Sequence, residues 1–306
     1  MTRLRDVTLR DGLQLTGKPL STAQKLDTVR TLRELGVPLL EIGSMARPDL
    51  VPSMANTVEV ISELTAEELA DCWVWVATPR HVERAAEAGA RNFQYCLSAS
   101  DSHNQANIGR TTDASLEALP KAAELAAAVG GTVQLCVATA FTCPFEGAIS
   151  PNRVLSIVRD ERAVLASEVV LCDTLGQAVP QEVHDLVSRT KSLDRREITY
   201  HGHDTWGLGV ANSLAAVAAG ATTVDGALGG LGGCPFAPGA AGNTATEDLL
   251  FALRPDWLDP EKFGAVVRHS ARLLDDLGEP NRSRSAAGAL AGTTAFAWAV
   301  TPSELP

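Results

Sequence analysis

The chain has 306 residues, of which 45% are apolar, and its formal net charge is −11. This length suits one α/β barrel of about 250 residues with an extension, or two domains of about 150 residues each. An acidic surface is repelled by phosphate backbones, so we expect no binding to nucleic acid. The sequence shows neither an apolar run of membrane-spanning length nor a signal-peptide pattern, so we expect no membrane partner and a cytoplasmic location.

Short strand-like runs alternate with helical runs along the first half of the chain. Arg3–Leu9 is expected to form the first strand. A helix should follow over Ser21–Leu35, because Ser21 or Thr22 can cap its N-terminus and Gly36 can end it. The other expected elements are strands over Pro38–Ile42, Trp73–Ala77 and Asn92–Leu97, a helix from His81 that stops at Gly89, and a helix near Leu116–Val129.

The second half of the chain repeats this rhythm. A helix should begin at Ser150-Pro151 and run toward Leu165, because proline is favoured at the first helical position. The expected strands are Thr132–Ala138, Glu168–Cys172, Glu197–His203 and Thr222–Leu228. The other expected helices cover Glu182–Leu193 and Gly207–Ala219, and a last one begins at Thr246.

Eight strand–helix units at roughly 30-residue spacing predict a (β/α)8 TIM barrel, for which we assign residues 1–255. A doubly wound open sheet is the alternative, but no G-x-G-x-x-G fingerprint follows the first strand. The pattern changes after Arg254, where Asp259-Pro260 opens a helix that runs to Gly278. We therefore expect residues 256–306 to form a C-terminal helical extension packed on the barrel, or an element of a homodimer.

Two histidines stand at the end of the expected seventh strand, in His201-Gly202-His203-Asp204. Residues i and i+2 of a strand point to the same side, so His201 and His203 can hold one metal ion between them. The alternative is a pair of structural histidines on the barrel rim. Active sites of such barrels lie at the C-terminal ends of the strands, which favours the metal.

The first strand ends in Leu9-Arg10-Asp11-Gly12. Asp11 can give a carboxylate oxygen to the same metal, while Arg10 can stabilise a developing enolate or oxyanion. Taken alone, this tetrapeptide fits a surface ion pair in a turn at least as well.

A glycine-rich segment follows the eighth strand, from Gly229 to Gly242-Asn243, with Cys234 near its centre. Such a segment is typical of an active-site loop. Cys234 is a candidate acid–base group, and Asn243 can add a neutral oxygen ligand. A phosphate-binding loop is the rival interpretation, but no Gly-Lys-Ser/Thr closes the segment.

Three carboxylates, Glu41, Asp173 and Glu247, stand at or just beyond other strand ends. A carboxylate pair for glycoside hydrolysis would also fit, yet it would leave the histidines and the cysteine without a role. Imidazole, carboxylate and amide ligands favour a divalent Mg or Mn ion over a thiolate zinc site, although Zn or Co could occupy the position.

With these motifs the chain resembles the hydroxymethylglutaryl-CoA lyase family, within the metallolyase barrels that also include isopropylmalate and citramalate synthases. The matching segments extend from the first strand to the last barrel helix. They are Arg10-Asp11-Gly12-Leu13-Gln14, Leu40-Glu41, Cys143-Pro144-Phe145-Glu146-Gly147, Asp173-Thr174-Leu175-Gly176, His201-Gly202-His203-Asp204-Thr205, Gly230-Leu231-Gly232-Gly233-Cys234-Pro235-Phe236-Ala237, Gly242-Asn243 and Ala245-Thr246-Glu247-Asp248.

The resemblance implies a carbon–carbon lyase that cleaves 3-hydroxy-3-methylglutaryl-CoA, or a similar acyl-CoA, into acetyl-CoA and acetoacetate by a retro-Claisen reaction. A base such as Asp173 or His203 would remove the hydroxyl proton, Arg10 would hold the enolate and Cys234 would protonate it. By position, the implied metal ligands are Asp11, His201, His203 and Asn243, and the implied catalytic residues are Arg10, Cys234, Asp173, Glu41 and Glu247.

Residues beside these motifs depart from the family pattern, as at Leu15-Thr16 and Ile42–Arg47. Two alternatives therefore stay open for the function. One is a lyase acting on another 3-hydroxy-3-alkyl acyl-CoA. The other is a Claisen-condensing acyltransferase that uses acetyl-CoA and a 2-oxo acid. A barrel with a decayed site is a third alternative, but the intact motif residues argue against it.

Overall fold

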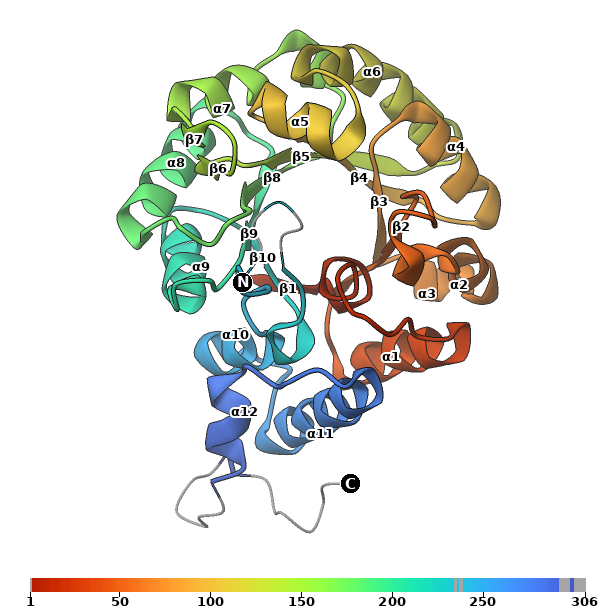
Figure 1. Cartoon of the computed structure of the whole chain (residues 1–306), viewed down its shortest axis with the longest axis vertical. Coiled ribbons are helices and arrows are strands. Elements are labelled where there is room, and N and C mark those ends of the chain that lie inside the picture. The colour runs from red at the N-terminus through yellow and green to blue at the C-terminus, as the bar shows by residue number, and fades with distance from the viewer. Residues whose placement is uncertain (1, 234–235, 237–238, 292–297, 300–306) are drawn as a thin grey trace.

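A ring of eight parallel strands closes into a barrel, in the order β1-β10-β9-β8-β5-β4-β3-β2 (Figure 1). The computed structural model describes residues 2–233, 236, 239–291 and 298–299. The predicted (β/α)8 TIM barrel is confirmed. The barrel strands are β1 Arg3–Asp6, β2 Leu39–Ser44, β3 Cys72–Val76, β4 Asn92–Ser98, β5 Thr132–Ala138, β8 Glu168–Asp173, β9 Glu197–Gly202 and β10 Thr223–Gly226.

Helices surround the ring (Figure 1), and several begin and end where the sequence predicts. In α1, the Ser21 hydroxyl accepts a hydrogen bond from the Gln24 amide, and Gly36 ends the helix in the left-handed conformation with φ 100°. The helices are α1 Thr22–Leu35, α2 Thr57–Glu63, α3 Ala66–Leu69, α4 Pro79–Ala88, α5 Asp101–Ile108, α6 Thr112–Ala128, α7 Pro151–Val158, α8 Pro180–Leu193, α9 Gly209–Ala218, α10 Thr246–Leu253, α11 Pro260–Leu277 and α12 Arg284–Ala289.

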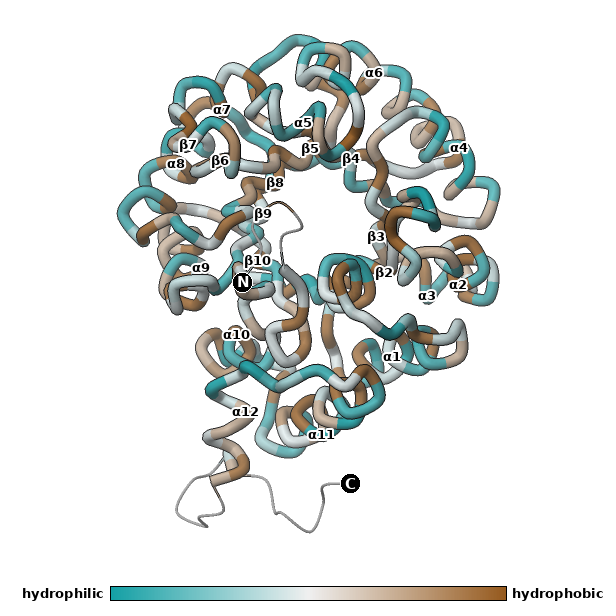
Figure 2. Tube along the Cα trace, in the orientation of Figure 1, coloured by the Kyte–Doolittle hydropathy of each residue, from teal (hydrophilic) through white to brown (hydrophobic). Residues whose placement is uncertain are grey.

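Buried apolar residues of the strands and helices form one large core. Figure 2 shows hydrophobic positions in the barrel strands and in the helices around them. Strands of a parallel barrel are covered by helices on the outside and by other side chains on the inside, which explains their nearly continuous apolar sequences. In β3, for example, all residues from Cys72 to Val76 are buried. The core extends to α11 through Phe263 and Val266, which are fully buried.

The first strand is shorter than the sequence predicts. It ends at Asp6, whose Oδ1 accepts a hydrogen bond from the Thr8 amide at 3.0 Å. One π-helical turn, η1 over Thr8–Gly12, follows and is closed by a hydrogen bond from the Gly12 amide to the Val7 carbonyl. Arg10 and Asp11 therefore project from a helical turn above the barrel instead of a strand end.

The structure differs from the sequence-based expectation at other places too, and helices α2 and α3 were also not predicted. Helix α5 was not predicted, because its sequence Asp-Ser-His-Asn-Gln-Ala-Asn-Ile lacks the apolar repeat of an amphipathic helix. Helix α7 ends at Val158, well before Leu165, and a short 3-10 turn over Glu161–Ala163 precedes β8. A two-stranded hairpin, β6 Thr142–Cys143 and β7 Gly147–Ala148, also interrupts the barrel rhythm.

The chain beyond the barrel forms α11 and α12. Helix α11 packs against α1 and α10, and α12 packs against α10. The predicted boundary between the barrel and the C-terminal extension, at residue 256, stays a prediction, because α11 shares the apolar core of the barrel. None of the helices in the described part of the chain is long and apolar enough to cross a membrane.

Candidate active site and metal centre

A cavity of about 630 Å³ opens at the C-terminal ends of the barrel strands. Four of the residues predicted for the site line it together: Arg10, Asp11, His201 and His203. Their positions in the chain are almost 200 residues apart, so the closure of the barrel between β1 and β10 is what joins them. This location agrees with the rule that barrel active sites lie at this face.

Asp11, His201 and His203 form a cluster that could hold a metal ion. One ligand atom from each lies within 4.8 Å of the others, and all three residues are buried. Asp11 Oδ2 is 3.2 Å from His203 Nε2 and 3.7 Å from His201 Nε2. Two imidazole nitrogens and a carboxylate oxygen are common ligands for divalent metals in proteins.

Both imidazoles are oriented by a second partner at Nδ1. His201 Nδ1 lies 3.0 Å from Asp225 Oδ2, and His203 Nδ1 lies 3.3 Å from the Ala241 carbonyl oxygen. Because a carboxylate and a carbonyl can only accept, each Nδ1 is the donor, and each Nε2 is the nitrogen that faces Asp11. This arrangement is typical of metal-binding histidines.

Asp225 was not among the predicted site residues. It is fully buried, and the Arg5 guanidinium donates to both of its oxygens, Nε to Oδ1 at 2.9 Å and Nη2 to Oδ2 at 2.8 Å. Arg5 also donates to the Gln134 side chain. The sequence does hold a signal for Asp225, because it is a charged residue in the middle of an expected barrel strand. A charged side chain in that position must have a partner inside the barrel.

Asn243 adds a fourth candidate ligand. Its Nδ2 donates to Asp11 Oδ2 and to the Leu231 carbonyl, both at 3.0 Å, and an isolated bridge pairs the residue with His203. Its buried Oδ1 has no hydrogen-bond partner within the described part of the chain. Buried amide oxygens normally have a partner, so a cation beside Asp11 would satisfy this atom. The residues present therefore fit a divalent metal.

Arg10 projects into the cavity beside this cluster. Its guanidinium pairs with Asp11, lies 3.5 Å from Glu41 Oε2 and sits over the Trp75 ring at 5.3 Å from the centroid. Glu41 is itself held by the Gln94 amide, which donates to Oε1 at 2.7 Å. Glu41 thus fixes the guanidinium from behind and does not line the cavity.

The pKa values of Asp11 and Glu41 are shifted in opposite directions. Burial alone would raise the pKa of Asp11, but the Arg10 guanidinium and the hydrogen bond with His203 outweigh it and hold the pKa well below its usual range. Burial raises the pKa of Glu41, although the Arg10 guanidinium opposes the shift. Asp11 is therefore the carboxylate of this pair that is poised to serve as an anionic ligand.

Asp173 and Glu247 do not line the cavity in the part of the chain that the structure describes. Asp173 accepts hydrogen bonds from the Gln177 and Ala178 amides, both at 3.1 Å, so it holds the loop after β8. Both Glu247 oxygens accept from the Gly229 amide, at 3.1 and 2.9 Å, and burial raises its pKa to about 7. Each carboxylate fixes a loop at the barrel mouth.

Cys234 lies outside the described residues, so its predicted role stays a prediction. The Gly233 carbonyl accepts a hydrogen bond from the Gln14 amide at 3.3 Å. The Phe236 ring packs at 5.1 Å from the His103 ring and 5.8 Å from the Phe145 ring. These contacts place Gly233 beside Gln14, and Phe236 beside α5 and the β6–β7 hairpin.

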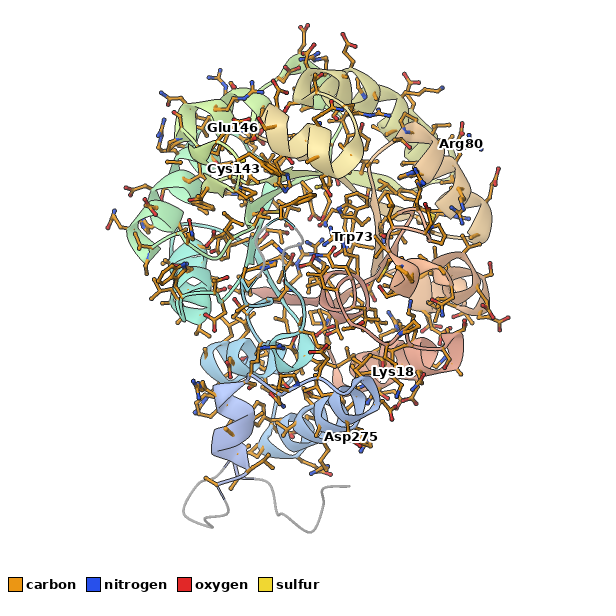
Figure 3. The ribbon with its side chains drawn as sticks, in the orientation of Figure 1. Lys18, Trp73, Arg80, Cys143, Glu146 and Asp275 are labelled. Carbon is orange, nitrogen blue, oxygen red and sulfur yellow. The ribbon has the colours of Figure 1, made fainter. Side chains whose placement is uncertain are left out.

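That hairpin is tied to the start of α5. Glu146 Oε1 accepts a hydrogen bond from the Ser102 amide at 2.9 Å, and Cys143 Sγ lies 3.0 Å from Ser100 Oγ (Figure 3). Helix α5 also supplies His103, which lines the cavity and which the sequence pattern did not single out.

Comparison with known proteins places these features in a family. The HMGL-like family model matches residues 2–262. The chain belongs to the HMGL-like family. The (R)-citramalyl-CoA lyase of Chloroflexus aurantiacus is 38% identical over 90% of each chain. The hydroxymethylglutaryl-CoA lyase of Pseudomonas mevalonii is 34% identical over 90% of this chain and 92% of its own.

A solved structure shows the same relationship. The HMG-CoA lyase from Acinetobacter baumannii, in complex with coenzyme A and 3-methylmalate, superposes with a TM-score of 0.86 at 35% identity and covers 96% of both chains. The predicted family is confirmed, and with it the enzyme class. This member of the HMGL-like family is a carbon–carbon lyase.

Replacement of Asp225 by asparagine should weaken metal binding by about 10- to 100-fold, because the change removes the anionic acceptor that orients His201. Titration of the metal-free protein with Mn²⁺, followed by electron paramagnetic resonance, measures this affinity directly. Asp194→Asn is the control, since Asp194 also pairs with an arginine, Arg196, but lies outside the cavity. Equal affinities in all three proteins would contradict a role for Asp225.

Proposed function

We propose that this lyase is divalent-metal-dependent and cleaves a 3-hydroxy-3-methylglutaryl-CoA-like acyl-CoA, by a retro-Claisen reaction, into acetyl-CoA and a 3-oxo acid such as acetoacetate. One observation carries the proposal: the Asp11, His201 and His203 cluster shares a cavity with Arg10 in a chain related to two acyl-CoA lyases. Asn243 would complete the protein ligands.

Mg or Mn is the proposed metal, because carboxylate and amide oxygens accompany the two imidazoles and no thiolate does in the described cluster. A divalent ion held there would polarise the oxygens of the substrate and neutralise developing negative charge. Asp11 and Asn243 would bring it beside Arg10, whose guanidinium contacts Asp11.

Arg10 is the proposed enolate-stabilising group. Cleavage of the bond between C2 and C3 leaves the electron pair on the thioester, where negative charge develops on the carbonyl oxygen. A fixed, desolvated guanidinium stabilises such a charge without reorganisation in the transition state. Glu41 and Trp75 fix Arg10 in the structure, so we propose Glu41 as a positioning residue. Asp173 and Glu247 would likewise act by positioning loops.

Cys234 is the proposed acid that protonates the enolate. Cys234→Ser should leave metal affinity unchanged and lower kcat by about 100-fold, since general acid catalysis typically contributes 10²–10⁴-fold. Steady-state cleavage and Mn²⁺ titration measure the two quantities. Cys72→Ser is the matched control, because Cys72 is a buried thiol of β3 outside the cavity. Full activity of Cys234→Ser would rule out a chemical role for this thiol.

A second candidate substrate is citramalyl-CoA, which would yield acetyl-CoA and pyruvate. The 38% identity to a citramalyl-CoA lyase over 90% of the chain favours it. The two candidates share the tertiary carbinol and the thioester, and differ in whether the carboxylate is attached to the carbinol carbon directly or through a methylene group.

A cleavage assay tests the proposal and separates the candidates. The metal-stripped protein is supplied with Mg²⁺ or Mn²⁺ and either acyl-CoA, and acetyl-CoA, acetoacetate and pyruvate are quantified. Metal-dependent release of acetyl-CoA is the expected result. Absence of cleavage, together with release of free CoA thiol from acetyl-CoA and a 2-oxo acid, would instead identify a condensing enzyme.

A further inference from the structure

Three cysteines line the cavity from neighbouring strands of the ring (Figure 1): Cys96 of β4, Cys136 of β5 and Cys172 of β8. All three are free thiols with 3–5% of their surface exposed. None of them belongs to the candidate metal cluster in the described part of the chain. The proposed cleavage reaction also gives none of them a role, so their presence in the cavity needs a separate explanation.

Cys136 and Cys172 are in direct contact, because their Sγ atoms are 3.4 Å apart. The strand register brings them together. Cys136 pairs with Val170 of β8, and Cys172 follows two positions later, so both side chains point to the same side of the sheet. Because both residues also line the cavity, one ligand that enters it can reach both sulfur atoms.

The surroundings of this pair are apolar. Both thiols belong to a buried cluster with Trp75, Ala77, Cys96, Ala138 and Val170. Thiols in such surroundings stay protonated at pH 7 and behave as small hydrophobic groups. A metal cation binds thiolates and must displace these protons, which the apolar surroundings disfavour. The pair therefore suits an uncharged ligand that reacts with two protonated thiols.

We infer that Cys136 and Cys172 form a binding site for trivalent arsenicals, in which one arsenic atom bonds to both sulfur atoms. The ligand is the uncharged hydrate, which carries two hydroxyl groups on arsenic. Two As–S bonds form and two As–O bonds break. Each departing hydroxyl group takes the proton of one thiol, so two water molecules leave and the arsenic stays trivalent.

The separation of the two sulfur atoms fits such an adduct. Two bonds of about 2.3 Å, the usual metal–thiolate length, span about 3.4 Å when they meet at roughly 95°. Cys136 Sγ and Cys172 Sγ are already 3.4 Å apart. The arsenic atom can therefore bridge them without movement of β5 against β8.

An adduct at this pair would block the active site. Cys172 is the direct partner of His201 in the β8–β9 register, and both residues line the cavity. A phenyl group on the arsenic atom would project into this cavity of about 630 Å³, beside the candidate metal ligands. The adduct should therefore exclude the substrate while leaving every candidate metal ligand in place. Binding of the arsenical does not depend on which acyl-CoA is cleaved.

Titration of the full-length, metal-loaded enzyme with phenylarsine oxide tests the inference. Intact-protein mass should show one phenylarsenic group per chain at an equimolar dose, and cleavage should fall in proportion to the labelled fraction. 2,3-Dimercaptopropanol should remove the group at a concentration at least about 100-fold lower than 2-mercaptoethanol, because attachment at two points increases retention by this order. Absence of labelling, or removal by both reagents at equal concentration, would overturn the inference.

The labelled residues are identified without any substitution. After labelling, the enzyme is unfolded and treated with iodoacetamide, and peptide mapping shows which thiols have been alkylated. Cys136 and Cys172 should be protected, whereas Cys96, Cys143 and Cys234 should react. Protection of any other pair would place the arsenical elsewhere. This measurement uses mass alone, so it decides even if neither candidate acyl-CoA is cleaved.

Two serine variants test the need for both sulfur atoms. Cys136→Ser and Cys172→Ser should each lose the resistance of the adduct to 2-mercaptoethanol, because one As–S bond remains at most. Cys96→Ser is the matched control, since Cys96 is a buried thiol of the same cavity and the direct partner of Cys136 in β4. An adduct that resists 2-mercaptoethanol in Cys172→Ser but not in Cys96→Ser would show that Cys136 pairs with the wrong neighbour in this assignment.

Discussion

Replacement of His203 by alanine is expected to lower metal-dependent cleavage by at least about 1,000-fold, and to abolish tight binding of Mn²⁺. The change removes one of the two imidazoles of the cluster and leaves Asp11 Oδ2 without the nitrogen that lies 3.2 Å away. Loss of one ligand from a site of three or four protein ligands strongly lowers the affinity for the metal. A factor of 1,000 corresponds to about 4 kcal/mol in the activation free energy.

The matched control for this change is His184→Ala. His184 belongs to α8, and its side chain is 47% exposed on the surface. Both variants are compared by circular dichroism to confirm folding, by Mn²⁺ titration and by the cleavage assay. Normal turnover of His203→Ala after the metal has been stripped would show that the cluster is not the catalytic metal site.

Replacement of Arg10 by glutamine should lower kcat by about 100- to 1,000-fold while the KM for the acyl-CoA changes little. The guanidinium is expected to act mainly on the enolate, which forms only as the bond breaks, and removal of one such stabilising donor typically has this effect. Arg10→Lys should recover little, because an ammonium group cannot contact Asp11, Glu41 and the Trp75 ring as the planar guanidinium does.

Arg30→Gln is the control for Arg10, since Arg30 also pairs with a glutamate, Glu68, but lies on the surface of α1. Mn²⁺ affinity is measured in parallel, because Arg10 contacts the candidate ligand Asp11. A fall in activity that is matched by an equal fall in metal affinity would mean that Arg10 positions Asp11 and does not stabilise the enolate.

The acyl-CoA proposal also bears on the charge of the chain. A net charge of −11 is unfavourable for an anionic ligand. The cavity, however, places Arg10 beside the candidate metal site, so the positive charge is concentrated where the reacting carboxylate and enolate are expected.

The order of strands and helices, and hence the barrel, could be predicted from the sequence because both signals are local. Capping residues and glycine stops mark helices such as α1, and continuous apolar runs mark strands such as β3. That His201 and His203 point to the same side could also be predicted, because alternate residues of one strand share a face in any fold. These features need only the geometry of a single element.

Elements without a local signal were misjudged. The first two residues of the π-helical turn, Thr8 and Leu9, are predicted as the end of the first strand, because nothing in the run Arg3–Leu9 marks the start of a turn. The polar helix α5 has no amphipathic repeat, and its buried His103 is held by the tertiary contacts of Ser98 and Phe236. In both places, long-range packing decides the conformation of a segment whose own preferences are weak.

What the sequence by itself determined was the barrel, the family resemblance and the identity of the reactive side chains near strand ends. Only the tertiary structure decided which of them meet. Closure of the ring brings Asp11 to His201 and His203, and Arg5 to Asp225, across more than 180 positions of the chain. The structure also shows that Asp173 and Glu247 bind backbone amides of nearby loops, whereas Cys136 lines the cavity. Side-chain partners of this kind depend on register and twist around the whole barrel, which no single segment encodes.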